Sequence, residues 1–372
     1  MLDFNVTVGS GYSLALIRAL KTDLTLTGRQ STASLKIPGT DAMPSGASYN
    51  SGNGNITVTG TGVTFEDWDF RNVTLTINSG ADVTKITECL FDGQRGFYDI
   101  QCNSGSRVRE VSWNTFDGGD NDATLWLRGD EMPDLIEHNR CLNGWDDYIK
   151  PGNNTDVTPV IQLNYFGPAK HWPNAKAAWN SGTTYNTGDV AQSGGNNYLS
   201  KTDGNTNNSI PNATHWASTD PHFDKIQWYN VVNNNMTIRW NYFDCESNDN
   251  NAGVTSCIFL DSGGSLGNGD IHMYENIIDM ADTTTAGGEV PQSIRVAGGG
   301  TGEAFLYHNY MRTAFKHLNN YGDTNLGTNW EFDGTNTKGA VILSTDGDVT
   351  NTGTITDYTG SEGAEGANWT GY

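Results

Sequence analysis

Six short stretches of the chain share one pattern, and this pattern decides the fold. In each, polar and apolar residues alternate before an asparagine, and an apolar or aromatic residue ends the stretch. They read VSWNTF (111–116), IEHNRC (136–141), IQLNYF (161–166), IRWNYF (238–243), MYENII (273–278) and LYHNYM (306–311). Upstream, FEDWDF (65–70) and ITECLF (86–91) fit the same pattern, with Trp68 and Cys89 in place of the asparagine.

The spacing of these stretches predicts a β-solenoid. The shared position recurs after 21 residues from Trp68 to Cys89, then after three steps of 25 to Asn164, one of 77 to Asn241, and steps of 35 and 33. Coils of this length stack because none can bury its apolar face alone. Stacked coils pair in parallel about 4.8 Å apart, so we expect a column of hydrogen-bonded asparagines at one turn. A β-propeller would need longer, four-stranded repeats.

We therefore predict an all-β chain that folds as a right-handed parallel β-helix of about ten coils. The 77-residue step exceeds a 25-residue coil by 52 residues, which indicates an inserted module. We expect the stretch LALIRALK near the N-terminus to form a short helix over the open end of the core. The predicted parts are an N-terminal cap (1–50), the coils (51–168 and 221–345), the small inserted β module (169–220) and a C-terminal cap or tail (346–372).

Charge and composition limit the partners. The 372 residues include 43 acidic and 21 basic ones, for a formal charge of −22. So negative a surface repels phosphate backbones, and we expect no nucleic-acid partner. No stretch approaches 18 apolar residues, so we expect no membrane partner either. The five cysteines lack CxxC spacing, and we interpret them as buried small hydrophobic residues rather than a disulfide or zinc framework.

The first residues, MLDFNVTVGSGYS, have neither the basic nor the apolar region of a signal peptide. Either such a peptide has been removed, or export takes another route, for instance as part of a phage particle. The expected location is therefore extracellular or virion-associated.

The inserted module carries aromatic residues in a Gly-, Asn-, Ser- and Thr-rich background, as WNSGTTYNTGDVAQSGGNNYLSKTDGNTNNSIPNATHW (179–216). This stretch resembles the small carbohydrate-binding modules of chitinases and cellulases, in which W, Y-x-x-G-D, G-x-x-Y, P and a closing W follow in this order. The resemblance implies that Trp179, Tyr185, Tyr198 and Trp216 bind sugar rings by stacking. The alternative is that these aromatic residues form the core of a very small module.

Seventeen residues before three of the column asparagines stands an aspartate, namely Asp122, Asp147 and Asp224. Carboxylates stacked about 5 Å apart repel one another unless a cation lies between them. Ca²⁺ prefers such oxygen ligands, and Asp120 and Asp146 are near enough to contribute. The alternative is that the three aspartates cap separate turns.

Fourteen residues before column asparagines lie polar residues with apolar neighbours, so alternation places them on the outer face of one sheet. These are Lys150, Gln227 and Arg295, joined at slightly different offsets by Arg128 and Asp261, with Trp228, Tyr229 and His317 nearby. Basic residues are scarce in this chain, so the stripe indicates substrate binding or catalysis. A charge ladder that stabilises the sheet is the alternative.

The coil repeat, over about 56–345, resembles the pectate-lyase-like β-helix superfamily, which includes pectate and alginate lyases, polygalacturonases and phage tailspike depolymerases. GWDDYIKPGNNTDVTPVIQLNYF (144–166) resembles its stretch in which acidic residues precede a strand that ends in lysine. LRGDEMPDLIEHN (127–139) and IRVAGGGTGEAFLYHNYM (294–311) resemble alginate lyase coils with a basic residue before a glycine turn.

The resemblance implies a lyase that cleaves a uronic-acid polymer, of the pectate or alginate type, by Ca²⁺-assisted β-elimination. Lys150 would remove the C5 proton, while Arg295 or Arg128 would bind the carboxylate or act as the acid. Calcium would be held by Asp122, Asp146, Asp147 and Asp224, and substrate by Gln227, Tyr229 and Asp261.

Two other functions stay open from the sequence. One is a polygalacturonase-like hydrolase that uses Asp146 and Asp147 as its carboxylate pair. The other is a non-catalytic phage or cell-surface protein that binds polysaccharide. In every case the expected partner is an acidic polysaccharide, and the chain is either a monomer or a tailspike-like homotrimer.

Overall fold

The computed structural model describes most of the chain between residues 16 and 340. The described residues are 16–29, 31–92, 98–118, 123–127, 133–144, 147–151, 158–168, 177–186, 189–194, 196–212, 214–218, 223–229, 235–244, 254–261, 270–279, 292–297, 304–307, 309–312, 324–326, 330–332 and 337–340. The predicted C-terminal cap or tail (346–372) lies outside them.

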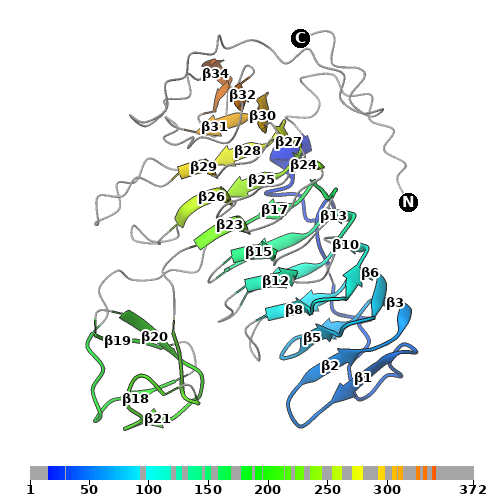
Figure 1. The fold of residues 1–372 in the computed structure, drawn as a ribbon. Helices are drawn as coiled ribbons and strands as arrows, with labels where there is room; N and C mark the ends of the chain where they lie inside the picture. Colours follow the sequence, from blue (N-terminus) through cyan, green and yellow to red (C-terminus); the bar gives the residue numbers. More distant parts are fainter. Residues whose placement is uncertain are drawn as a thin grey trace.

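The chain is all-β and builds three large sheets, which it visits in turn (Figure 1). Sheet 1 contains β1 (Ala47–Asn50), β2 (Asn55–Val58), β5 (Thr74–Ile77), β8 (Tyr98–Cys102), β12 (Ala123–Leu127), β15 (Asp147–Pro151), β23 (Phe223–Tyr229), β26 (Val254–Asp261) and β29 (Gln292–Ala297). Sheet 2 contains β3 (Thr61–Glu66), β6 (Asp82–Thr87), β9 (Arg107–Val108), β10 (Glu110–Ser112), β13 (Leu135–Glu137), β16 (Val160–Gln162), β24 (Asn235–Arg239), β27 (Asp270–Tyr274), β30 (Ala304–Tyr307) and β32 (Thr324–Leu326). Sheet 3 contains β4 (Asp69–Phe70), β7 (Leu90–Phe91), β11 (Thr115–Asp117), β14 (Arg140–Leu142), β17 (Tyr165–Phe166), β25 (Tyr242–Asp244), β28 (Ile277–Asp279), β31 (Tyr310–Arg312), β33 (Trp330–Phe332) and β34 (Thr337–Ala340).

Successive circuits of the three sheets, which we call coils, pair in parallel. In sheet 2, for example, Val111 pairs with Ile136, and Ile136 with Ile161, at the predicted 25-residue step. Among the described strands of these three sheets, only the first pair (β1–β2) and the last pair (β33–β34) are antiparallel. The parallel, coil-by-coil arrangement agrees with the repeat found in the sequence.

The predicted asparagine column forms the turn between sheet 2 and sheet 3. The amide Nδ2 of each asparagine donates to Oδ1 of the next, at 3.0–3.1 Å, from Asn114 to Asn309. That same Oδ1 accepts the backbone N–H of the preceding asparagine. These side chains are at most 1 % exposed. The buried side-chain amides of the column thus all have partners, as burial requires.

The residue before each of the column positions from Trp68 to Asn276 has a left-handed backbone conformation. Its φ lies between 52° and 63° in seven successive coils, at Asp67, Glu88, Trp113, His138, Leu163, Trp240 and Glu275. Trp68 and Cys89 occupy the asparagine place in the first coils, as the sequence predicted, and the Cys89 N–H donates to Oδ1 of Asn114. A positive φ turns the chain sharply at each coil, and because it disfavours most L-residues, the asparagine hydrogen bonds must offset its cost.

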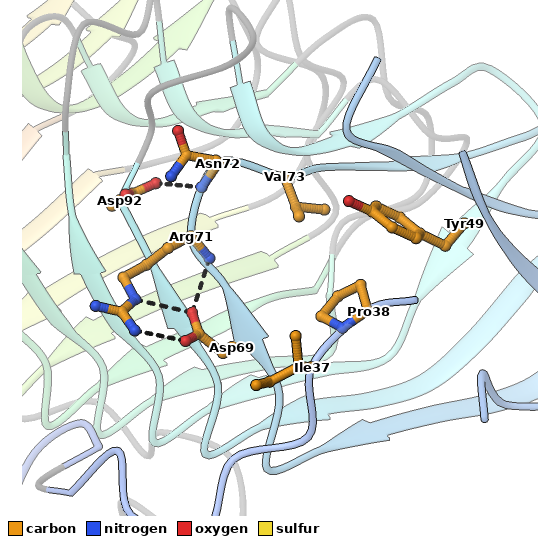
Figure 2. Close-up of a pocket in the computed structure, with 8 residues that line it drawn as sticks. All are labelled: Ile37, Pro38, Tyr49, Asp69, Arg71, Asn72, Val73 and Asp92. Atoms are coloured by element: carbon orange, nitrogen blue, oxygen red, sulfur yellow. Dashed lines mark hydrogen bonds and ion pairs between the residues drawn. The ribbon is translucent and has the colours of Figure 1, made fainter. Parts of the chain in front are cut away.

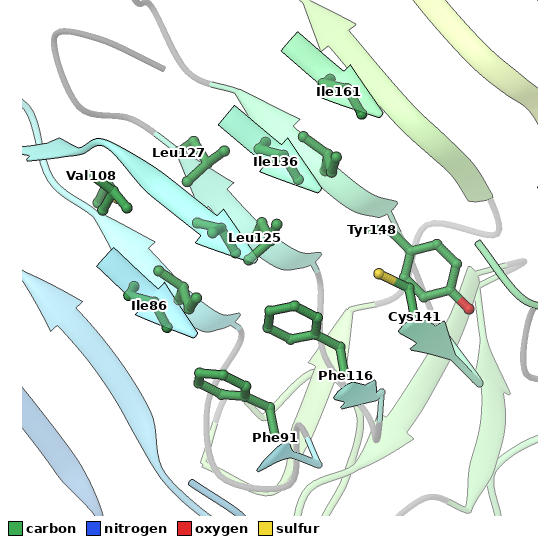
Figure 3. Close-up of a cluster of buried hydrophobic side chains, with 14 of the residues drawn as sticks. Ile86, Phe91, Val108, Phe116, Leu125, Leu127, Ile136, Cys141, Tyr148 and Ile161 are labelled. Atoms are coloured by element: carbon green, nitrogen blue, oxygen red, sulfur yellow. The ribbon is translucent and has the colours of Figure 1, made fainter. Parts of the chain in front are cut away.

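Apolar side chains from all three sheets fill the space between them (Figure 3). Rings stack along the axis at the start of sheet 3: the centroids of Phe91 and Phe116 lie 4.8 Å apart, and those of Phe166 and Phe243 lie 4.9 Å apart. Like residues therefore contact like residues in neighbouring coils, which explains why the short pattern repeats along the sequence.

The N-terminal segment differs from the predicted cap. Its single helical turn, at 16–19, packs on the outer face of sheet 3, and Ile17 and Leu20 are fully buried there. They contact a stripe of residues from four coils, namely Tyr165, Tyr242, Ile277 and Tyr310. The helix therefore covers the side of the stack and not the open end of its core, because its apolar residues pack on this stripe.

From this turn the chain runs along the stack towards the first coil. Lys21 contacts Asp244 at 2.9 Å and Asp279 at 3.4 Å, both of them buried carboxylates. Further on, the Gly28 N–H donates to the His138 carbonyl at 2.7 Å, and Arg29 forms an ion pair with Asp67. We call residues 16–36 the strap, because they join coils that lie far apart in the sequence.

The cysteines only partly match the prediction. Cys89, Cys102 and Cys141 are free and buried, as expected, and burial raises the pKa of Cys89 and of Cys102 to about 12. Cys257, in contrast, is disulfide-bonded, so the interpretation of all five as free thiols was wrong. Within the described part of the chain, no helix is long and apolar enough to cross a membrane.

The inserted segment forms two small antiparallel sheets of its own (Figure 1). One joins β18 (Thr184–Tyr185) to β21 (Asn205–Thr206); the other contains β19 (Val190–Ser193), β20 (Asn196–Ser200) and β22 (Trp216–Ser218). The chain leaves the stack after β17 and returns to it in β23, so the insertion lies between sheet 3 of one coil and sheet 1 of the next.

Candidate functional site

Sheet 1 carries seven of the predicted site residues on its strands: Asp147, Lys150, Asp224, Gln227, Tyr229, Asp261 and Arg295. Its strands alternate, and one inward row consists of aliphatic residues that are at most 1 % exposed: Leu75, Ile100, Leu125, Ile149, Ile226 and Ile258. The residue after each of these occupies the alternate position of the strand. Strand register aligns these positions in one column, which we call the sheet 1 column: Thr76, Gln101, Trp126, Lys150 and Gln227, continued by the backbone positions of Phe259 and Arg295.

The sheet 1 column brings three predicted residues into line. Lys150 on β15 lies beside Gln227 on β23, and Arg295 on β29 follows two strands later. The side chains of Lys150 and Gln227 are half-buried. Tyr229 and Asp261 pair with each other two residues further along the same strands. For Tyr229, Asp261, Arg295 and Trp228 the structure describes the backbone only.

An aromatic pair precedes Lys150 on this face. Tyr98 on β8 and Trp126 on β12 stack with ring centroids 3.9 Å apart and an interplanar angle of 27°. Both are half-buried, so they present part of their surface to solvent. The sequence analysis missed this pair because its counting began from residues with charge. The alternation in ATLWL (123–127) was the signal that points Trp126 outward.

Lys150 is held by a buried carboxylate. Its Nζ lies 3.2 Å from Oδ2 of Asp147, whose side chain is 0 % exposed, whereas that of Lys150 is 28 % exposed. The other oxygen, Oδ1, accepts the backbone N–H of Asp224 at 3.0 Å. Asp147 therefore fixes both the lysine and the next coil, and its carboxylate does not reach solvent.

The predicted aspartate column is present only in part. Asp147 and Asp224 are neighbours on consecutive coils and are buried. On the preceding coil the residue beside Asp147 is Ala123, because the step along this sheet is 24 residues instead of 25. Asp122 lies outside the described residues, and so do Asp120, Asp146, Arg128 and His317.

The described aspartates do not match the calcium site that the sequence predicts. No group of three His, Cys, Asp or Glu side chains with metal-binding geometry occurs among the residues the structure describes. Ca²⁺ takes six to eight oxygen ligands, and the Asp147 oxygens already serve Lys150 and the Asp224 N–H. A calcium site thus stays a prediction that depends on residues outside the described ones.

A buried lysine joins this corner to the base of the insertion. Lys225, next to Asp224, is 0 % exposed and donates from Nζ to the carbonyl of Gly167, the first residue after β17 (Tyr165–Phe166). Nζ also lies 5.1 Å from the centre of the Tyr148 ring. Burial lowers the pKa of Lys225 to about 7, because the charged form loses its hydration. Strand alternation would direct Lys225 outward, so its burial could not be predicted from the pattern.

Tyr148 acts on the same carbonyl. Its hydroxyl lies 3.2 Å from the oxygens of Gly167 and Pro168, and it accepts the N–H of Gly144 at 3.0 Å. Burial raises the pKa of Tyr148 well above its ordinary value. The two ends of the insertion are therefore fastened by one buried lysine and one buried tyrosine.

Two of the four aromatic residues predicted to bind sugar form the core of the inserted module. Tyr185 and Trp216 pack edge to face with centroids 5.0 Å apart and are 8 % and 2 % exposed. Their polar atoms are engaged as well: the Tyr185 hydroxyl accepts the Asn180 N–H, and Trp216 Nε1 donates to the Asn208 carbonyl. Core packing, the alternative, describes them better.

Trp179 and Tyr198 are half-buried against that core. They keep part of their ring surface accessible, so they are the two module aromatics that remain available for a sugar. Specificity for a particular polymer does not follow from two such rings.

Comparison with known proteins does not add a relative: no protein-family description, no curated protein and no solved structure matches the chain.

Proposed function

We propose that the chain is a right-handed parallel β-helix that holds an acidic polysaccharide along the outer face of sheet 1 and cleaves it by β-elimination. The observation that carries this proposal is the sheet 1 column. It combines one hydroxyl group, two amide groups, a lysine and Trp126, whose ring stacks on Tyr98, and its lysine is oriented by the buried Asp147.

The charge of the face supports an acidic ligand. The chain as a whole carries −22, yet Lys150 and Arg295 both stand in the column. They are three strand spacings apart, or about 14 Å. They would therefore meet different sugars of one chain laid along the axis of the stack.

In the proposed reaction, Lys150 in its neutral form takes the C5 proton of a uronate, and the C5–H electron pair forms the C4=C5 double bond. The 4-linked oxygen leaves with the electron pair of the C4–O bond and takes a proton from water. The proton is acidic only while the neighbouring carboxylate is neutralised or hydrogen-bonded. Gln227, beside Lys150 on the next coil, would donate its amide N–H to that carboxylate. A cation held by the predicted aspartates would supply further neutralisation, but the described pair does not fit one, and no step depends on it here.

The test is the ultraviolet absorbance of the unsaturated product on pectate, alginate and other uronic polymers. Lys150→Ala should lower kcat/KM by about 10²- to 10⁴-fold, the usual contribution of a general base. Lys85→Ala is a matched control, because Lys85 also points outward and pairs with a carboxylate, Glu110, at 2.8 Å on sheet 2. Equal activity of the two variants would contradict the role of Lys150. A parallel series with chelator tests the predicted Ca²⁺.

A second candidate function is binding without cleavage. The half-exposed Tyr98–Trp126 stack favours it, because aromatic faces grip sugar rings without any reaction. Under this function, Trp126→Ala abolishes retention on the polymer and no product absorbs. The hydrolase alternative has less support: Asp147 is fully buried and its oxygens are engaged, so it cannot activate water beside a substrate. New reducing ends without absorbance would revive it.

The disulfide at Cys257 supports an extracellular or virion-associated location, since such bonds persist in oxidising surroundings. The choice between a monomer and a tailspike-like trimer stays a prediction, which light scattering of the purified chain decides.

A further inference from the structure

A separate cavity lies at the first coil, far from Lys150 in the order of sheet 1 (Figure 2). It sits where the residues after the strap pass the turn between β4 and β5. Its volume is about 290 Å³, near the lower end of the range for small-molecule sites. None of the functions argued above uses it.

One side of this cavity is apolar. Ile37, Pro38 and Val73 line it together with the ring of Tyr49. Ile37 is 51 % exposed, which is unusual for so large an aliphatic side chain in this molecule. The Tyr49 ring lies over Gly39, where a Cβ would come within 3.1 Å of it, so glycine leaves the room that the ring needs.

The opposite side is polar and fixed in place. Arg71 grips Asp69 with two side-chain hydrogen bonds, from Nε to Oδ1 at 2.9 Å and from Nη2 to Oδ2 at 2.6 Å. These bonds lower the pKa of Asp69, so its carboxylate is charged at neutral pH. Asn72 has φ 58°, and its backbone N–H donates to Asp92 at 2.6 Å.

Three polar groups in the cavity have spare hydrogen-bonding capacity. Within the part of the chain that the structure describes, no hydrogen bond involves the side-chain amide of Asn72, the hydroxyl of Tyr49 or Nη1 of Arg71. The Asn72 amide can both donate and accept, whereas Nη1 only donates. A ligand with several hydroxyl groups would satisfy all three.

The charges in the cavity exclude ions. Arg71 is compensated by Asp69, which accepts from two of its nitrogens, so an anion gains little. A cation finds no open carboxylate pair, because Arg71 holds both Asp69 oxygens and Asn72 already engages Asp92. What remains is a neutral polar molecule with one apolar face.

We propose that this cavity binds one neutral pyranose ring, whose hydroxyls bond to Arg71 and Asn72 while its C–H face lies against Tyr49 and Val73. The volume suits a single ring, and the pairing of a fixed polar wall with an aromatic wall is what a sugar requires. This site is independent of cleavage on sheet 1, and it differs from that face in selecting against uronates.

The test is ligand-observed NMR titration of the full chain with the methyl glycosides of glucose, galactose and mannose, and with the corresponding uronates. Neutral glycosides should bind, and uronates should bind at least tenfold more weakly. Asn72→Gly keeps the left-handed backbone and the N–H to Asp92 but removes the amide, so it should weaken binding about five- to tenfold. Tyr49→Phe, which removes only the hydroxyl, should weaken it by a similar factor.

Arg71→Ala should abolish detectable binding. Arg109→Ala is its matched control, because Arg109 makes the same two-bond contact with Asp82 (Nε–Oδ1 3.1 Å, Nη2–Oδ2 2.5 Å) outside the cavity, and it should change nothing. A disaccharide that ends in the same sugar distinguishes a free monosaccharide from a chain end. Tighter binding of uronates, equal affinity in all four variants, or no binding of any neutral glycoside would overturn the proposal.

Discussion

Replacing Asn164 by alanine tests whether the asparagine column holds the coils together. Its Nδ2 donates to the carbonyls of Ile136 and Gln162 at 2.9 Å and to Oδ1 of Asn241 at 3.0 Å. Its Oδ1 accepts the backbone N–H and the Nδ2 of Asn139 at 2.9 and 3.0 Å. Asn164→Ala removes these five bonds. Four of them count about 0.5 kcal/mol each, and the loss of the fifth leaves the buried Asn139 N–H unsatisfied at about 2 kcal/mol, so the free energy of unfolding should fall by about 4 kcal/mol.

Two other asparagines provide a graded comparison. Asn114 makes three side-chain bonds because its upstream neighbour, Cys89, has only a backbone N–H to offer; Asn114→Ala should lower the free energy of unfolding by about 3 kcal/mol. Asn103 is half-buried, and its side chain forms two hydrogen bonds, with Asn78 and Gln101, so Asn103→Ala should lower the free energy of unfolding by about 1 kcal/mol.

The assay is urea unfolding followed by far-UV circular dichroism, which gives the free energy of unfolding of the three variants and of the unmodified chain. The slopes of this free energy against urea concentration are compared as well. The expected order of destabilisation is Asn164, then Asn114, then Asn103. If the losses in the free energy of unfolding caused by Asn164→Ala and Asn103→Ala differ by less than about 1 kcal/mol, hydrogen bonding within the column does not stabilise the stack as described.

Three further changes test other parts of the structure. Burial lowers the pKa of Lys225 to about 7, so between about pH 7 and 10.5 the unfolded chain binds more protons than the folded one, and this group makes stability rise with pH. Lys225→Met should therefore flatten the rise of Tm with pH in that range. An unchanged slope of Tm against pH would count against the buried, neutral lysine. Lys21→Met leaves the buried carboxylates of Asp244 and Asp279 without the lysine ammonium, which should lower the free energy of unfolding by about 2 kcal/mol. The strap should then become open to cleavage by trypsin at Arg18. Protection from trypsin equal to that of the unmodified chain would refute the contact. Cys257→Ser should lower stability by about 2–4 kcal/mol, and reductant should lower the Tm of the unmodified chain but not of the variant.

The turn between sheets 2 and 3 could be predicted from the sequence because its chemistry leaves little choice. At position 139 the side chain must accept a hydrogen bond from one coil and donate one to the next, and the short amide of asparagine does both. The same residue type recurs at a fixed step. The opposite corner, before sheet 1, has no such constraint. There the step between two coils is 24 residues instead of 25, which places Ala123 beside Asp147. Counting 17 residues back from the asparagine column therefore does not identify neighbouring residues at this corner.

Burial of single residues near the insertion was beyond the pattern. Lys225 follows the alternation of an outward residue, yet it lies inside because the Gly167 carbonyl at the exit of the chain needs a donor. In the inserted module, Trp216 stands where the resemblance to carbohydrate-binding modules predicts a sugar-binding aromatic residue, but its side chain is buried in the core. A single sequence does not distinguish these, since both uses need an aromatic ring in a polar loop.

The strap also sets an order of events during synthesis. Lys21 reaches Asp279, 258 residues later in the chain. At about 5–20 residues per second, roughly 13–50 s separate the appearance of the two partners on the ribosome. The coils that the strap crosses must therefore stack without it, and its first-made residues are the last to find their place. Each finished molecule is closed along its side by a segment that left the ribosome before the coils it joins.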